Sequence, residues 1–81
     1  MDVFIIYRTD VWHSIASREM IGIYSTKRKA IQAIKKDAEM QDEELEDDDI
    51  YMLNNYNQTQ SRNVGNEYEI EQVTLNNRLI L

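Results

Sequence analysis

Residues 25–49, STKRKAIQAIKKDAEMQDEELEDDD, decide the fold because they carry the longest periodic apolar pattern in a short chain. At about 100° per residue, four apolar side chains fall on one side of a helix. These are Ala30, Ile31, Ile34 and Ala38. Leu45 extends the stripe, and Ser25 or Thr26 offers a hydroxyl that caps free backbone N–H groups at the helix start. The pattern predicts a helix from Thr26 to about Leu45.

The charges along this stretch run against the helix dipole. Lysines and an arginine crowd its start and carboxylates crowd its end, although a helix favours the opposite arrangement. The pattern does not fix where the helix ends, because neighbouring carboxylates in residues 42–49 repel one another and disfavour a last helical turn. We therefore expect packing to hold the helix. Its bipolar surface can associate with itself in a symmetric pair or present carboxylates to a basic groove.

Strand patterns flank the helix. Residues 3–7, VFIIY, and residues 18–24, REMIGIY, are rich in β-branched and aromatic side chains, and their short link favours an antiparallel hairpin. After the helix, residues 50–53, IYML, read as a third strand. Residues 67–75, EYEIEQVTL, alternate as a half-exposed fourth strand.

These elements predict a single α+β domain over residues 1–81, in the order β-β-α-β-β. One helix should cover one face of an antiparallel sheet of three to four strands. Val73 is out of phase with Tyr68 in the last strand, which indicates a bulge or a strand end near Gln72. Residues 54–66 are polar and predict a long turn or a mobile loop.

Composition narrows the class of protein. The chain has no cysteine, so disulfides and cysteine zinc sites are excluded, and a reducing compartment is favoured. We expect a soluble, cytoplasmic protein, because the first ten residues lack a signal-peptide pattern and no segment approaches a membrane span. A formal net charge of −6 argues against direct binding of nucleic acid. It permits simple solubility, a basic protein partner, or imitation of the charge of a nucleic acid.

The sequence offers few side chains that could catalyse a reaction. His13 has Asp10, Ser14 and Ser17 nearby, but groups three or four residues apart on one loop rarely converge into a triad. The two glycines cannot build a phosphate-cradling loop, so no cofactor is expected. The carboxylates of residues 42–49 lack the spacing of a calcium loop, so no specific metal site is expected. The sequence predicts a protein that is not an enzyme.

Residues 21–30, IGIYSTKRKA, carry a resemblance to other proteins. An aliphatic-Gly-aliphatic-aromatic strand end, followed by Ser-Thr and a charged helix start, resembles a junction found in small uncharacterised phage and bacterial proteins. The resemblance covers residues 2–38 and 68–75. It implies a ββαβ core and an origin in a phage or mobile element, and it carries over no catalytic residue.

The features that remain point to binding. An exposed tryptophan is a common anchor at protein interfaces, and closely spaced carboxylates suit a basic surface. The expected partner-binding residues are Trp12, Glu43, Glu44, Glu46, Asp47, Asp48 and Asp49. We expect a module that binds and inhibits a host protein or complex, for example a nucleic-acid-handling defence system such as CRISPR, by mimicry of nucleic acid.

Two alternatives stay open. The apolar residues 79–81 and exposed sheet edges favour a self-assembling accessory protein, with a homodimer as its simplest form. A small metal-binding or enzymatic domain is the other alternative.

Overall fold

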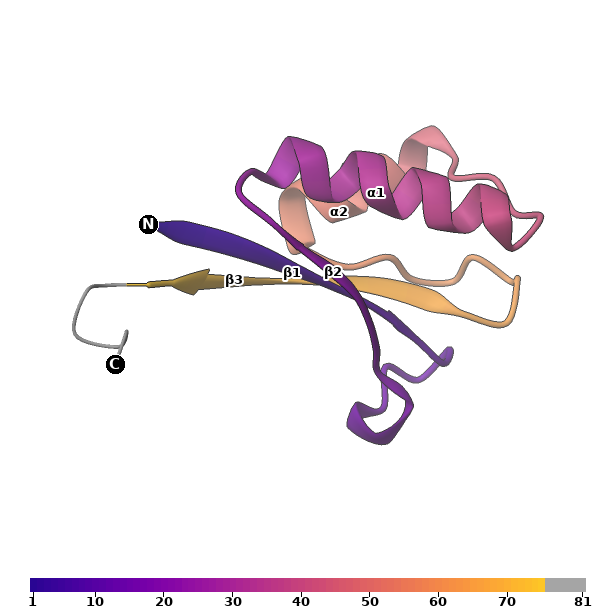
Figure 1. Cartoon of the computed structure of the whole chain (residues 1–81). Coiled ribbons are helices and arrows are strands. Elements are labelled where there is room, and N and C mark those ends of the chain that lie inside the picture. Colours follow the sequence, from indigo (N-terminus) through magenta and orange to yellow (C-terminus); the bar gives the residue numbers. More distant parts are fainter. Residues whose placement is uncertain (76–81) are drawn as a thin grey trace.

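The structure, a computed structural model of the chain, describes residues 1–75. A three-stranded antiparallel sheet with the strand order β2-β1-β3 carries two helices on one face (Figure 1). A short 3-10 turn, Ile15–Ser17, lies in the loop between the first two strands. The elements are β1 (Asp2–Thr9), β2 (Glu19–Tyr24), α1 (Lys27–Met40), α2 (Asp47–Tyr56) and β3 (Glu67–Thr74). The mixed α+β class is confirmed, and the order is β-β-α-α-β.

The predicted hairpin of β1 and β2 is confirmed as an antiparallel pair. Its register shifts between Ile6, which pairs with Gly22, and Tyr7, which pairs with Met20. Ile21 is therefore an extra residue, a bulge in β2.

The bulge expected near Gln72 is wrong, because β3 pairs with β1 without a break from Asp2↔Thr74 to Thr9↔Glu67. Val73 is out of phase with Tyr68 because it belongs to the opposite face of the sheet, where it pairs with Val3.

Helix α1 begins as predicted. The Thr26 hydroxyl accepts the Lys29 N–H at 3.1 Å, and the whole predicted apolar stripe is buried. The helix ends at Met40 and not near Leu45, because Asp42 turns into the left-handed region at φ 58°. The Glu43 N–H then bonds back to the Ala38 carbonyl at 2.8 Å. Leu45 still packs against the core, from the connection after the helix.

The third strand predicted at residues 50–53 is wrong, because these residues lie in the middle of α2. Three aspartates form the first turn of that helix, where its dipole favours negative charge. Leu53 is fully buried against the core, and Ile50, one turn earlier, is half-buried. A run of four apolar residues fits a strand or one face of a helix equally well, so the pattern alone could not distinguish them.

The polar segment predicted as a loop over residues 54–66 is shorter than expected. Its first residues complete α2, and the next ones run beside β3. There the Thr59 N–H bonds to the Tyr68 carbonyl at 2.9 Å, and the Ile70 N–H bonds to the Asn57 carbonyl at 2.7 Å. Only residues 60–66 connect this segment to β3 without regular structure. The expectation for residues 79–81 lies outside the described part of the chain.

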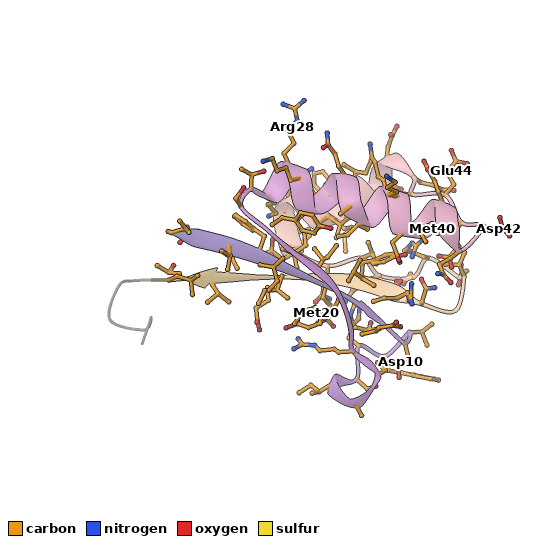
Figure 2. The ribbon with its side chains drawn as sticks, viewed as in Figure 1. Asp10, Met20, Arg28, Met40, Asp42 and Glu44 are labelled. Carbon is orange, nitrogen blue, oxygen red and sulfur yellow. The ribbon has the colours of Figure 1, made fainter. Side chains whose placement is uncertain are left out.

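The core lies between the sheet and the two helices. Its buried residues are Ile6, Ala30, Ile31, Ile34, Ala38, Leu53, Tyr68 and Ile70. Within it, the Tyr68 hydroxyl donates to Asp37 at 2.6 Å, and burial raises the pKa of that hydroxyl. Neither α1 nor α2 lies on the opposite face of the sheet, and Met20 projects from that side, whereas Arg28 points from α1 into solvent (Figure 2). Neither helix is long and apolar enough to cross a membrane in the part of the chain that the structure describes.

Candidate protein-binding surface

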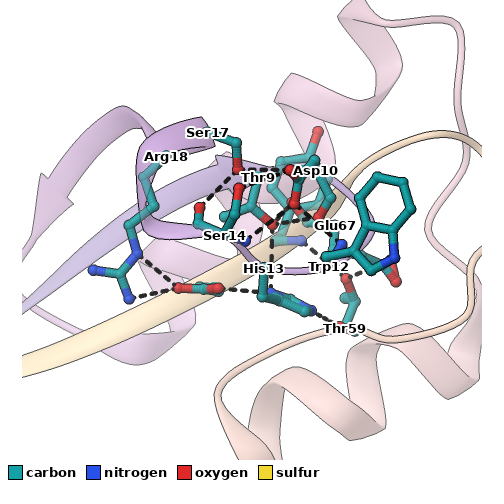
Figure 3. A network of polar contacts seen from close by, with 11 residues as sticks. Thr9, Asp10, Trp12, His13, Ser14, Ser17, Arg18, Thr59 and Glu67 are labelled. Carbon is teal, nitrogen blue, oxygen red and sulfur yellow. Dashed lines mark hydrogen bonds and ion pairs between the residues drawn. The ribbon is translucent and has the colours of Figure 1, made fainter.

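Trp12 stands out from the loop between β1 and β2, with 82% of its surface exposed. Asp10 braces this loop: its carboxylate accepts the N–H groups of Trp12 and Ser14 at 3.1 and 3.0 Å and the Ser14 hydroxyl at 2.7 Å (Figure 3). The bond from the Ser14 hydroxyl is the main cause that lowers the pKa of Asp10. The Ser17 hydroxyl accepts the Asp10 N–H at 3.0 Å. The backbone that carries the indole is therefore ordered by these bonds.

His13 ties the same loop to the rest of the molecule. Its Nδ1 lies 2.6 Å from a Glu69 oxygen and its Nε2 lies 2.9 Å from the Thr59 carbonyl oxygen. Arg18 bonds the other Glu69 oxygen at 2.7 Å (Figure 3). Both ring nitrogens of His13 are thus engaged away from Ser14 and Ser17. The triad-like set of residues does not converge, and each member has a place in holding the loop.

The acidic run of the sequence surrounds an open hollow of about 440 Å³ between the start of α2 and the loop of residues 60–64. Four of its carboxylate residues line that hollow: Glu44, Glu46, Asp48 and Asp49. Asp47 is exposed beside them, at the first position of α2. The tertiary structure therefore gathers most of the predicted acidic residues around one concave surface.

Arg62 is the residue that sequence reasoning missed. Its side chain is only 2% exposed and its guanidinium lies 3.1 Å from Glu43 and 3.6 Å from Asp49, over the ring of Tyr68. Asn66 strengthens this joint, because its amide donates to Glu43 at 2.8 Å. A signal was present in the sequence: Arg62 is the single cation between residues 37 and 77.

The position of Arg62 divides the acidic residues into two groups. Glu43 and Asp49 are held in ion pairs, and Asp49 also accepts the Glu46 N–H at 3.0 Å, so both serve the fold. The remaining carboxylates make no ion pair with any described residue; they are Glu44, Glu46, Asp47 and Asp48. We call these four the acidic surface.

The acidic surface and Trp12 belong to neighbouring parts of the molecule. A second hollow of about 290 Å³ is lined by Val11, which precedes Trp12, and by Glu67. Both hollows share the loop residues 61–63. In that loop Ser61 and Asn63 adopt left-handed backbone conformations with φ near 60°. The shared loop therefore has the apolar side chain of Val11 on one side and carboxylates of the acidic run on the other.

Within residues 1–75, no three His, Asp or Glu side chains converge to hold a metal ion. Comparisons of the chain with protein-family models, with curated proteins and with solved structures found no match in any of the three. The function proposed below therefore rests on the geometry and charge of the surface.

Proposed function

We propose that this chain is a non-enzymatic binding module that uses Trp12 and the acidic surface to bind and inhibit a basic protein partner. The observation that carries the proposal is the pairing of two features. An 82% exposed tryptophan is braced by a hydrogen-bonded loop, and four carboxylates that have no ion-pair partner among the described residues gather at the start of α2, on the other side of the loop of residues 61–63.

Each feature suits binding for a physical reason. A tryptophan on an ordered loop contributes a large contact area with little loss of backbone entropy, and tryptophan is enriched among interface residues that dominate affinity. Free carboxylates around a concave surface attract lysine and arginine side chains and accelerate encounter with a basic partner. The net charge of −6 acts in the same direction.

The class of partner follows from the charge. Basic grooves are typical of proteins that handle nucleic acid, because such grooves bind phosphates. Carboxylates clustered on one surface can occupy such a groove in place of phosphates. We therefore propose a host protein or complex that handles nucleic acid as the target, and a phage or mobile element as the source of the chain.

The first test is affinity capture from a bacterial lysate at low and moderate salt, followed by mass spectrometry and a binding measurement on the captured protein. The test variant is Asp47→Asn/Asp48→Asn, which removes two charges of the acidic surface. The matched control is Glu39→Gln/Glu71→Gln, which removes two exposed charges elsewhere. We expect the test variant to bind at least about tenfold more weakly and with less dependence on salt.

Two further measurements complete the test. Trp12→Ala should weaken binding by about 2 kcal/mol or more if the indole is an anchor. A nucleic-acid duplex should displace the chain from its partner if the carboxylates imitate phosphates. Equal losses in the test and control variants would show that only net charge matters, and the proposal would then be wrong.

A further inference from the structure

The open face of the sheet, on the side away from α1 and α2, is apolar at one end. Side chains alternate between the two faces of a sheet, and Ile6 and Ile70 are buried on the helix side. The odd-numbered residues of β1 and β3 therefore lie on the open face, as does Ile23, which pairs with Ile5. We call the apolar residues near the start of β1 on this face the apolar end: Val3, Ile5, Ile23 and Val73.

The loop between β1 and β2 leaves the apolar end uncovered. That loop lies on the same side of the sheet, but at the opposite end of the strands (Figure 1). There the Arg18 guanidinium lies 4.7 Å from the centre of the Tyr7 ring, and His13 lies against Glu69. At the apolar end, by contrast, Ile23 is 56% exposed. An uncovered group of aliphatic side chains on a sheet is typical of a surface that another segment occupies.

We propose that residues 76–81, which follow β3 directly, fold back over the open face and cover the apolar end. These residues, NNRLIL, lie outside the described part of the chain. Leu79, Ile80 and Leu81 supply the apolar side chains of the contact. Asn76 and Asn77 supply the reversal of the chain, because asparagine adopts turn conformations readily.

The position of β3 supports this occupant. Leu75, the last described residue, bonds to Met1 at the start of β1, so the chain leaves the sheet beside the apolar end. Val73 is only two residues earlier in β3. The far limit of the apolar end is Ile5, opposite Glu71, which lies about 13 Å back along the strand from Leu75. Six extended residues span about 20 Å, so the segment is long enough to cross this distance.

Charge favours the same segment. Glu71 is exposed on the open face and makes no ion pair with any described residue. Arg78 is the single charged residue of residues 72–81. A segment that returns over the open face brings this guanidinium toward the Glu71 carboxylate, at the rim of the apolar end. Arginine and carboxylate groups form strong, directional hydrogen bonds.

Tethering favours the segment over a second copy of the chain as the occupant. Because the segment is joined to β3, its effective concentration at the open face is on the order of millimolar. A second copy reaches such a concentration only in a very concentrated solution. The segment therefore covers the apolar end first at ordinary protein concentrations.

The test is NMR spectroscopy of the full chain, in which nuclear Overhauser effects (NOEs) detect methyl groups that lie close together. We expect NOEs from the methyl groups of Leu79, Ile80 and Leu81 to those of Ile5 and Ile23. A mixed sample of isotope-labelled and unlabelled chains separates contacts within one chain from contacts between two. Absence of these NOEs would overturn the proposal. So would NOEs that arise only between chains, because a second copy would then cover the face.

Charge reversal tests the path of the segment. Arg78→Glu and Glu71→Lys should each raise the undocked population about twofold or more, and the two changes together should restore the NOE intensities. Glu39→Lys is the control, because Glu39 is exposed on α1, on the other side of the sheet. NOE intensities that fall in the control as much as in the single variants would contradict the proposed pairing. A combined variant without recovery would contradict it as well.

Discussion

Thr26 shows how much a single residue contributes to α1. Its hydroxyl accepts the Lys29 N–H at the helix start, where the first turn holds no carboxylate to complement the dipole. Thr26→Ala should lower the free energy of unfolding by about 1 kcal/mol, and Thr26→Ser should change it little. Urea denaturation followed by circular dichroism measures both. A Thr26→Ala variant as stable as the wild type would show that tertiary packing alone holds the helix start.

A second prediction for a single residue concerns Glu67 and the dependence of folding stability on pH. Burial raises the pKa of its carboxyl above the ordinary value, and the Arg62 N–H and charge offset only part of that rise. A group with a raised pKa in the folded state stabilises the fold below its unfolded pKa, and this contribution is lost as the pH rises through the folded pKa.

Glu67→Gln removes this titration. The variant should be more stable than the wild type near pH 7, because the wild type then carries a buried charge. The gap should close as the pH falls to about 4, where glutamate is protonated in the unfolded chain as well. Thermal denaturation of both proteins from pH 4 to pH 8 gives the difference. A gap that does not change with pH would contradict the assignment.

At the scale of elements, Arg62 joins three of them. Its guanidinium connects the segment after α1, the start of α2 and the ring of Tyr68 in β3. Arg62→Met leaves Glu43 and Asp49 with little exposure and no ion-pair partner among the described residues, so it should cost about 3–5 kcal/mol. Arg62→Lys keeps the charge but loses the forked contact, and should cost less. Chemical denaturation ranks the three proteins, and equal stability would disprove the role of Arg62 as a joint.

The two helices illustrate what local pattern can specify. For α1, 14 residues of 3.6-residue periodicity and a capping threonine made its type and start predictable. For α2, the apolar run of residues 50–53 was too short to distinguish a helix from a strand. The aspartates before it marked a helix start, but their position after α1 made them look like the end of that helix.

At the scale of the whole molecule, the proposed binding surface draws on two separate parts of the chain. Trp12 lies in the loop between β1 and β2, whereas the acidic surface surrounds the start of α2. The effects of Trp12→Ala and Asp47→Asn/Asp48→Asn on the affinity for a partner should therefore add within about 0.5 kcal/mol, as titration of the single and combined variants would show. A larger interaction would mean that the two parts of the surface are coupled.

The sequence by itself determined what depends on counts and on neighbours along the chain. The hairpin, the apolar stripe of α1, the lack of cysteine and the net charge all follow from local pattern or composition. Only the tertiary structure decided which acidic residues are free and how Trp12 is held. Those outcomes depend on partners distant in sequence: Glu43 meets Arg62 across 19 residues, and His13 meets Glu69 across 56. Such contacts form only when the core brings the elements together, because no local pattern encodes which distant side chain will lie nearby.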